Sequence, residues 1–211
     1  MPKKTRSTAE VDAVREKILG CAFAILVKNG YEGLSMAKVG ARMKMTAANL
    51  YNYYANKDEL LIAIHKKAYG MLHDQLRAAV QKAKTPLERY RRMTQAFVAF
   101  GTQNVNIYDI MFNRRIRQHS DYVGTPQEAL SEEEFRSSLK VRSLAVKLIK
   151  EYRASLAVAS SADPEFLAIQ ATSLLHGIIS LYNSGVLGEI AADPRGVLDK
   201  VVENAMRIVT D

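Results

Sequence analysis

The stretch from Thr46 to Leu61, TAANLYNYYANKDELL, carries an unusual density of amide and phenol side chains. The amide groups of Asn49 and Asn52 are of the kind that pairs with the N6 and N7 atoms of adenine together. The methyl group of Ala48 can pack against the methyl group of thymine. The chemistry predicted for this stretch is therefore recognition of base edges in a major groove.

Hydroxyl and cationic groups around the amides suit a phosphate backbone. Tyr51 and Tyr53 flank the amides, and their hydroxyls can reach phosphate oxygens on either wall of a groove. Lys57 lies in the first turn of a predicted helix, where its charge and the free backbone N–H groups together form an anion site. Ser35 offers the same kind of site at an earlier helix. The predicted nucleic-acid contacts are Ser35, Lys38, Lys44, Thr46, Ala47, Ala48, Asn49, Tyr51, Asn52, Tyr53 and Lys57.

Two short helices are predicted to position these side chains. Capping residues start one helix over residues 35–43 and another over residues 46–54. The link of residues 44–45 is too short for anything but two helices that cross at a steep angle, which is the helix-turn-helix arrangement. At about 100° per residue, Leu50 and Tyr54 face a small core and leave the amides on the opposite side.

Helix signals continue along the chain, and the sequence lacks alternating strand patterns bounded by turn residues. Capping-box spacing at Ser7 and at Asn56 predicts helices over about residues 8–29 and 57–82. The other predicted helices begin at Pro86, cover about Val105 to Phe112, run from Ser131 to about Val158, and begin at Pro164 and Pro194. A long connection is predicted over residues 113–130. The predicted fold class is all-α, with an N-terminal three-helix domain and a larger helical C-terminal domain.

The net charge of +8 comes entirely from the N-terminal part of the chain. Residues 1–84 hold 15 Lys and Arg against 7 Asp and Glu, whereas residues 85–211 hold 15 against 15. A positive field at one end favours a polyanion, with nucleic acid ahead of an acidic membrane surface, because phosphate neutralisation releases counterions. A solvated basic surface without a partner is the alternative explanation of the charge alone.

The composition disfavours several classes of protein. The single cysteine, Cys21, rules out an intrachain disulfide framework, and no apolar run approaches the length of about 20 residues that spans a bilayer. The basic start lacks the apolar region of a secretory signal, so we expect a cytoplasmic protein with no membrane partner. The four histidines are scattered, and no phosphate loop, nucleophile elbow or supported carboxylate pair occurs in the sequence. We therefore expect no enzymatic activity, no catalytic residue, no metal and no cofactor.

Residues 15–61, and above all FAILVKNGYEGLSMAKVGARMKMTAANLYNYYANKDELL, resemble the DNA-binding domain of the TetR/AcrR family of bacterial transcriptional regulators. The motifs that carry the resemblance are NGY, SM, VG, LY, YY and KDELL, in this order. The resemblance implies a homodimer that binds operator DNA through the helix-turn-helix domain of residues 1–56. Residues 57–211 would form the dimerisation and effector-binding domain, with helix 57–82 as the connection and the last two helices as the dimer contact.

Three positions depart from the pattern of this family. Lys44 stands where glycine is usual at the turn, Ala48 where glycine is common, and Asn49 where threonine or serine is usual. A lysine fits if the turn does not require a positive φ, and it costs a modest free energy otherwise. We expect these departures to change the operator sequence and to leave the fold intact. The family positions that contact phosphate are those of Tyr51, Tyr53 and Lys57.

The C-terminal half carries a shorter resemblance. The stretch Ala171 to Gly185, ATSLLHGIISLYNSG, is similar to a C-terminal domain of the same family marked by a Trp-His-Gly tripeptide, with Leu175 in place of tryptophan. Apolar residues on the last two predicted helices can pair with a symmetry mate in a four-helix interface. They are Phe166, Ile169, Ala171, Leu174, Ile178, Leu181, Val197, Leu198, Val201, Val202, Ala205 and Ile208. The alternative is that they complete the core of the monomer.

A small-molecule site in this half would use aromatic and methionine side chains at helical spacing. The candidates are Phe97, Phe100, Tyr108, Met111, Phe112, Tyr152 and His176, with Tyr90 and Tyr182 as further aromatic residues. Each of these side chains is equally compatible with an ordinary core position. The composition suggests an apolar or aromatic effector, and Arg114, Arg115 and Arg117 near an entrance would tolerate an acidic group.

Two functional hypotheses follow. In the first, a homodimeric repressor binds a palindromic operator and is released when a small effector shifts the population towards a conformer that no longer fits two half-sites. In the second, the regulator has no effector, and its C-terminal domain only dimerises. An internal cavity favours the first hypothesis, and a filled core favours the second.

Overall fold

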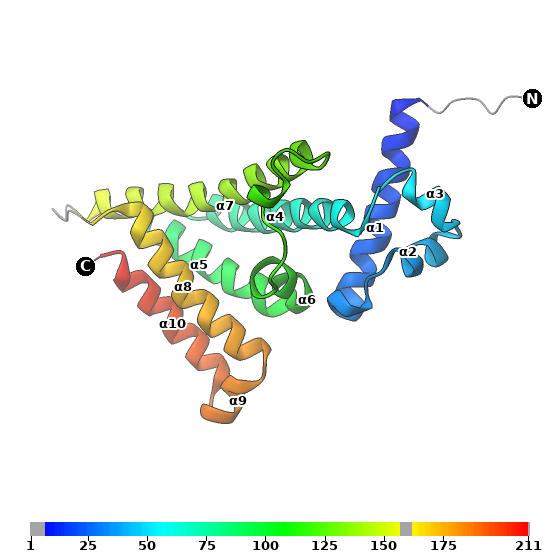
Figure 1. The fold of residues 1–211 in the computed structure, drawn as a ribbon. Coiled ribbons are helices and arrows are strands. Elements are labelled where there is room, and N and C mark those ends of the chain that lie inside the picture. Colours follow the sequence, from blue (N-terminus) through cyan, green and yellow to red (C-terminus); the bar gives the residue numbers. More distant parts are fainter. Residues whose placement is uncertain (1–6, 157–161, 211) are drawn as a thin grey trace, which may run out of the picture.

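The computed structural model describes residues 7–156 and 162–210, and within these ranges it contains helices and no β-strand. The all-α prediction is confirmed (Figure 1). The helices are α1 (Thr8–Gly33), α2 (Met36–Met43), α3 (Ala47–Tyr51), α4 (Lys57–Gln81), α5 (Pro86–Gln103), α6 (Val105–Tyr108), α7 (Glu128–Ser155), α8 (Pro164–Asn183), α9 (Val186–Ile190) and α10 (Pro194–Ile208). A π-helical turn (Asp109–Asn113) follows α6, and a 3-10 helix (His119–Tyr122) precedes α7.

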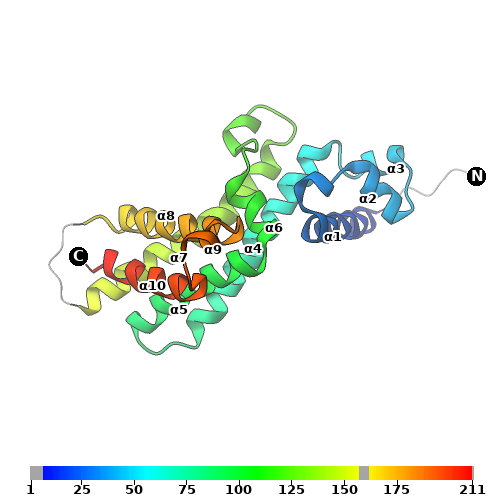
Figure 2. The ribbon, with the colours of Figure 1, turned by 90° about the horizontal axis from the view of Figure 1, so that it is seen from below.

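The helices form two parts that α4 joins. Figure 1 shows α1, α2 and α3 grouped at one end of the molecule, while α4 runs from this group into the larger helical part. There α4 packs against α5 and α7, and α8 packs against both α7 and α10. Figures 1 and 2 both show α8 and α10 side by side along one flank. One continuous hydrophobic core extends from Ile18 in α1 to Met206 in α10 and Val209 after it. No helix within the described residues is long and apolar enough to cross a membrane.

Side-chain N-caps start seven of the described helices at the places that the sequence predicts. In each case the side-chain oxygen accepts a hydrogen bond from a backbone N–H two or three residues further along the chain. The capping residues are Ser7, Ser35, Thr46, Asn56, Thr85, Asp163 and Asp193. Local sequence therefore determines most helix starts in this fold.

The start of α7 differs from the prediction. The sequence predicts Ser131 as the cap, but the helix begins earlier, at Glu128. The Ser131 hydroxyl is buried, donates to the Glu128 carbonyl and lies 2.9 Å from Nδ1 of His119. Ser131 thus lies inside the first turn and ties the 3-10 helix to α7. The predicted end near Val158 lies outside the described residues, and α7 itself ends at Ser155.

The helix α3 is shorter than predicted. The sequence predicts a helix that ends near Tyr54, but α3 ends at Tyr51, and Asn52 follows it as the C-cap. Tyr53 and Tyr54 then turn into the core, where they are 5% and 2% exposed. Both large rings are buried because the chain leaves the helix after Tyr51.

The segment between α5 and α7 also differs from the prediction. Instead of one short helix over residues 105–112, α6 gives way to the π-helical turn that contains Phe112. The predicted connection over residues 113–130 includes the 3-10 helix and the first turn of α7. The short helix α9 has no predicted counterpart. Insertions of a π-helical turn into an α-helix are rare and often mark functional positions.

Candidate DNA-binding face and ligand cavity

The turn between α2 and α3 holds a lysine in a left-handed conformation. Lys44 has φ +53° and ψ 39°, so this turn does require the positive φ that glycine adopts most easily. The Lys44 N–H donates to the Ala41 carbonyl, and the Met45 N–H donates to the Gly40 carbonyl over 2.9 Å. The left-handed conformation of a residue with a Cβ atom costs about 1–2 kcal/mol, and the lysine places a cation at the turn.

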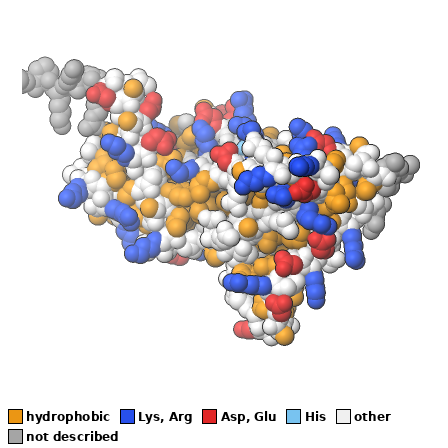
Figure 3. All heavy atoms as spheres, turned by 180° about the vertical axis from the view of Figure 1, so that it is seen from behind, with side chains coloured by type: hydrophobic (Ala, Val, Ile, Leu, Met, Phe, Trp, Pro, Cys, Tyr) orange, Lys and Arg blue, Asp and Glu red, His pale blue; other side chains and the backbone are white. Residues whose placement is uncertain are grey.

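The side chains predicted to meet bases lie on an exposed surface. Tyr51 is 48% exposed, Ala48 and Asn52 are exposed, and Asn49 is half-buried at the edge of the same surface. Leu50 is fully buried and anchors α3 on the small core. Of the other predicted contacts, the exposed ones are Lys38, Lys44, Thr46 and Ala47, and Ser35 is half-buried. Figure 3 shows Lys and Arg side chains along the outer edge of this part of the molecule, at left in that view.

Tyr53 does not lie on this surface. Its side chain is buried, although the sequence predicts it as one of the two flanking tyrosines. The prediction assumed a helix that continues to Tyr54, whereas α3 ends at Tyr51. Of the two tyrosines predicted to flank the amide side chains, only Tyr51 lies on the exposed surface.

Lys57 lies at the start of α4, where the sequence places it. Its ammonium group lies 4.2 Å from the centre of the Tyr31 ring, an attractive cation–π contact. The Glu59 N–H donates to the Asn56 side chain, which caps the helix, and other N–H groups of the first turn have no acceptor within the helix. The arrangement presents a cation and a helix N-terminus together, which suits a phosphate group.

A polar cluster fixes the link between α3 and α4 on α1. Arg15 donates to the backbone carbonyl of Tyr53 and to the Glu59 carboxylate, the latter over 2.8 Å. The Tyr54 hydroxyl donates to the Arg15 carbonyl over 3.3 Å, and the guanidinium lies 4.4 Å from the Tyr54 ring centre. Burial raises the pKa of Tyr54 to about 12, while the Arg15 charge opposes the shift. The cluster holds α3 at a fixed angle to α1.

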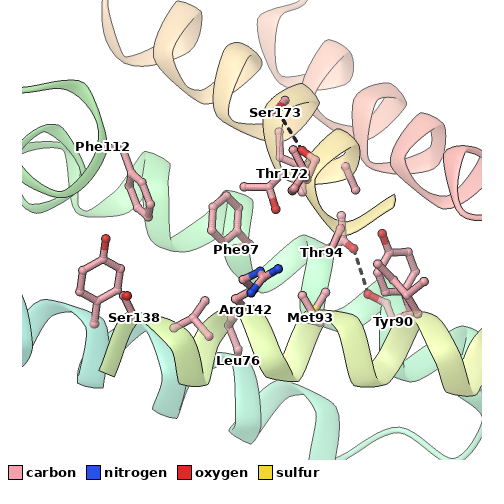
Figure 4. Close-up of a pocket in the computed structure, with 18 residues that line it drawn as sticks. Leu76, Tyr90, Met93, Thr94, Phe97, Phe112, Ser138, Arg142, Thr172 and Ser173 are labelled. Carbon is pink, nitrogen blue, oxygen red and sulfur yellow. Dashed lines mark hydrogen bonds between the residues drawn. The ribbon is translucent and has the colours of Figure 1, made fainter. Parts of the chain in front are cut away.

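The C-terminal part holds a cavity of about 310 Å³ that is partly open to solvent. This volume lies at the lower end of the range for small-molecule sites, about 300–1,000 Å³. The cavity is lined by Tyr69, Leu76, Tyr90, Met93, Thr94, Phe97, Phe112, Ser138, Val141, Arg142, Ala145, Ile149, Ala168, Ile169, Ala171, Thr172, Ser173 and Leu175. Figure 4 shows that they come from α4, α5, α7, α8 and the π-helical turn. Arg142 is the one charged side chain among these lining residues.

A smaller cavity of about 190 Å³ lies where the two parts of the molecule meet. His65 of α4 is 5% exposed there, and its Nδ1 lies 3.9 Å from the Glu134 carboxylate of α7. Burial lowers the pKa of His65 to about 4, against a raising effect of the Ile110 carbonyl, and burial raises the pKa of Glu134 to about 7. Both side chains are therefore uncharged below about pH 7 and above about pH 4. Tyr31 of α1 and Asp58 at the start of α4 line the same cavity.

Two family models match this chain. The model described as bacterial regulatory proteins, tetR family, matches residues 18–64, and the tetracyclin repressor-like C-terminal domain matches residues 90–205. The second match covers more than half of the chain. The chain belongs to the TetR family. The resemblance seen in the sequence is thus confirmed, and the family consists of DNA-binding transcriptional regulators.

Two relatives with curated names are HTH-type transcriptional regulators of low identity. An uncharacterized HTH-type transcriptional regulator of Haemophilus influenzae is 28% identical over 92 residues, which cover 44% of this chain and 49% of the relative. The HTH-type transcriptional activator FasR of Mycolicibacterium smegmatis is 26% identical over 118 residues, or 56% of this chain and 51% of the relative. The chain spans about half the length of the curated relatives it matches.

Solved structures share the fold over almost the whole length. A protein of unknown function from Rhodococcus sp. RHA1 has a TM-score of 0.76 at 19% identity, with all of both chains covered. FadR from Bacillus subtilis in complex with stearoyl-CoA has a TM-score of 0.66 at 13% identity, covering 90% of this chain and 97% of FadR. AibR in complex with isovaleryl coenzyme A and operator DNA has a TM-score of 0.59 at 20% identity, covering 91% and 95%.

Only part of the predicted ligand site of this TetR-family chain lines the cavity. Phe97 and Phe112 do, together with Tyr90. The other candidates pack outside it: Phe100, Tyr108, Met111 and Tyr152 are buried core residues, and His176 is half-buried. Nδ1 of His176 lies 3.0 Å from the Tyr108 hydroxyl, so its polar atom has a partner in the core.

The arginines predicted near an entrance also lie elsewhere. Arg114 pairs with Glu32 and with Asp109, each over 2.7 Å, and Arg117 pairs with Asp58 over 3.3 Å. The cation at the cavity is Arg142, which the sequence analysis missed together with the small residues of α7 and α8. A signal was present, since Ala168, Ala171 and Thr172 place small side chains on one side of a helix. Small side chains leave space, but only the packing of the neighbouring helices shows whether the space stays empty.

Proposed function

We propose that this chain is a homodimeric repressor that binds a palindromic operator in the bacterial cytoplasm and is released by a small effector. Residues 1–56 form the DNA-binding domain, and residues 57–211 form the dimerisation and effector-binding domain, with α4 as the connection. The observation that carries the effector part of the proposal is the mostly apolar cavity of about 310 Å³ between α4, α5, α7 and α8. A regulator whose C-terminal domain only dimerises would be expected to fill this space.

In the DNA complex, α3 lies in the major groove. Asn49 and Asn52 read adenine edges, and Ala48 packs against a thymine methyl group. Lys57 and Tyr51 bind phosphate groups on the two walls and fix the register of the helix. The exposure of Ala48, Asn52 and Tyr51 supports these roles.

Dimerisation uses the flank formed by α8 and α10. On α8, Phe166 is 55% exposed, Ile169 54% and Leu181 39%, so three large apolar side chains of this helix lie at the surface. On α10, by contrast, Leu198 and Val202 are buried in the core of the monomer. We therefore assign the apolar centre of the interface to α8 and a polar border to α10.

The route from cavity to DNA runs through the π-helical turn. Phe112 lines the cavity, and Arg114, two residues further on, pairs with Glu32 at the end of α1. The Arg114 guanidinium also lies 4.8 Å from the Tyr31 ring, on which Lys57 rests. In parallel, the Asn106 amide donates to the Val27 carbonyl of α1 over 2.9 Å. An effector that moves Phe112 would thereby shift α1 and α4 relative to the C-terminal domain, and with them the spacing of the two recognition helices.

The chemistry of the cavity favours an apolar effector. Tyr69, Met93 and Phe97 give it an aromatic and aliphatic wall. The acyl-CoA ligands of FadR and AibR are compatible with this choice, since both carry an aliphatic acyl group. An aliphatic chain is therefore the first effector class to test.

Filling the cavity provides the test. Ala168 is 5% exposed and lines the cavity, so Ala168→Phe places a ring in the empty space. We expect the variant to bind operator DNA with unchanged affinity and to remain bound when aliphatic compounds release the wild-type protein. Gly188→Ala, at a position with open space around a Cβ atom and outside the cavity, is the matched control. Release of the Ala168→Phe variant at wild-type effector concentrations would contradict the proposal.

A further inference from the structure

The charge of the cavity lining is concentrated in one residue. Of the side chains that line it, Arg142 alone is charged, and the remainder are apolar or carry hydroxyl groups. Figure 4 shows the Arg142 side chain extending from α7, with Thr172 and Ser173 on the facing helix α8. A guanidinium beside an otherwise uncharged cavity is a specific feature, because its five N–H donors match a carboxylate geometrically.

The present partner of Arg142 is replaceable. Arg142 pairs with Glu165 in the first turn of α8, and the two side chains are 52% and 43% exposed. A pair with this exposure stabilises a protein little, because solvent screens it and two long side chains lose freedom. A carboxylate bound in the cavity can therefore take the place of Glu165 at small cost.

Two further observations favour a ligand with one negative charge. The hydroxyls of Ser138 and Ser173 donate to the backbone carbonyls of Phe135 and Ile169. Within the described part of the chain the Thr172 hydroxyl makes no such bond, so it is available as a second donor beside Arg142. A single cation among hydroxyl donors suits a carboxylate, whereas the several phosphate charges of coenzyme A would require a larger basic cluster at the rim.

We propose that the effector is a monocarboxylate with an apolar tail, whose carboxylate pairs with Arg142 and displaces Glu165 while the tail fills the cavity. This inference rests on the proposed function, because it names the effector of the same cavity. It differs from the ligands of FadR and AibR, which are thioesters of coenzyme A. Glu165 acts as an internal competitor that holds Arg142 when no effector is present.

The inference is tested by comparing three probes of equal chain length on the full-length protein: octanoate, 1-octanol and octanoyl-CoA. Binding is measured by calorimetry, and operator release is measured separately. We expect wild-type protein to bind octanoate roughly tenfold more tightly than 1-octanol, the gain of one partly exposed charge-assisted contact. Octanoyl-CoA should bind more weakly than octanoate.

Variants on the two sides of the ion pair should have opposite effects. Arg142→Met should bring octanoate down to the affinity of 1-octanol while 1-octanol binding stays within about twofold, which also shows that the variant is folded. Glu165→Gln should raise octanoate affinity severalfold, because the competitor is gone. Arg136→Met is the control, since Arg136 lies on α7 outside the cavity lining and pairs with Glu132.

The outcomes separate this inference from the proposed function. Equal binding of octanoate and 1-octanol, an acid preference that survives Arg142→Met, or a clear preference for octanoyl-CoA would overturn the monocarboxylate inference and leave an effector-released repressor standing. Failure of all three probes to bind or to release a protein that selects its operator would overturn the effector part of the proposed function, and the inference with it.

Discussion

The DNA-binding face and the ligand cavity are built in contrasting ways. The face comes from one short stretch, residues 35–57, whose caps and turn are set locally. The cavity is assembled from four long helices and a π-helical turn, with lining residues spread from Tyr69 to Leu175. A locally specified site tolerates changes elsewhere in the chain, whereas an assembled site depends on every helix that encloses it. We therefore expect substitutions in the face to leave effector binding unchanged and substitutions around the cavity to act on both stability and response.

The largest effect should come from the anchor of the recognition helix. Leu50 is fully buried under α3, and Leu50→Ala removes that packing and leaves a cavity, at a cost of about 2–5 kcal/mol of unfolding free energy. Operator binding should be lost while ligand binding in the C-terminal domain persists, as measured by calorimetry and by a gel-shift assay on the same sample. Loss of ligand binding at a temperature where the variant is folded would show that the face and the cavity are not independent.

The next effect separates base reading from phosphate binding. Asn52→Ala and Asn49→Ala should each cost about 1–3 kcal/mol of discrimination between operator and random DNA if the amide contact is bidentate. Lys57→Ala should instead weaken binding to both DNAs and reduce the slope of affinity against salt by about one unit. Titrations at several salt concentrations measure both quantities. Equal losses on operator and random DNA for the asparagine variants would remove them from the reading face.

The junction between the two regions should respond to pH. The folded-state pKa of Glu134, about 7, lies above the ordinary value of 4.5, so the folded protein binds this proton more tightly than the unfolded chain does. The Glu134 carboxyl group makes its full contribution to the unfolding free energy below about pH 4.5. This contribution, about 1–3 kcal/mol, is lost as the pH rises through 7. Glu134→Gln should match the wild type near pH 4.5 and exceed it in stability above pH 7.

Urea unfolding between pH 4.5 and 8.5 measures this difference. His65 has the opposite dependence, since its lowered pKa destabilises the fold as the pH falls from 6.5 towards 4. Because His65 is present in both proteins, its effect cancels to first order in the difference between the variant and the wild type. A difference that does not change with pH would mean that Glu134 is ionised in the folded protein throughout this range.

The smallest effect concerns the turn. Lys44 adopts a left-handed conformation that glycine adopts without strain, so Lys44→Gly should raise the unfolding free energy by about 0.5–1 kcal/mol. The melting temperature should rise while affinity for DNA falls modestly, since a cation is removed from the face. Lys44→Ala, which keeps the strain and removes the charge, distinguishes the two contributions. A melting temperature lowered by Lys44→Gly would show that the lysine side chain stabilises the turn through contacts of its own.

The sequence predicted the local features well. The seven capping residues and the helix-turn-helix depend on contacts within a few residues, and all of them appear in the structure. The predicted end of α3 near Tyr54 was wrong, because burial of Tyr53 and Tyr54 is a tertiary effect that outweighs continuation of the helix. Ser131 was wrong as a cap because its hydroxyl has a partner on His119, twelve residues away.

The cavity was predicted poorly for the same physical reason. Phe97 and Phe112 line the cavity. Phe100, Tyr108 and Tyr152 are also aromatic residues at helical spacing, but they lie in the filled core. The missed residue with the clearest chemistry is Arg142, whose position depends on how α7 and α8 pack. Whether a cavity remains depends on how several helices pack together, and the residue pattern along one helix does not determine it.

Sequence-specific binding by a dimer can be measured by incubating genome fragments with the purified protein at near-physiological salt, with competitor DNA present, and sequencing the fragments that remain bound. We expect the recovered fragments to share a short palindromic site, with half-sites about 34–36 Å apart along the helix axis or a multiple of that spacing. Uniform recovery without a common site would contradict this expectation, and would mean that the basic N-terminal part follows phosphate charge alone.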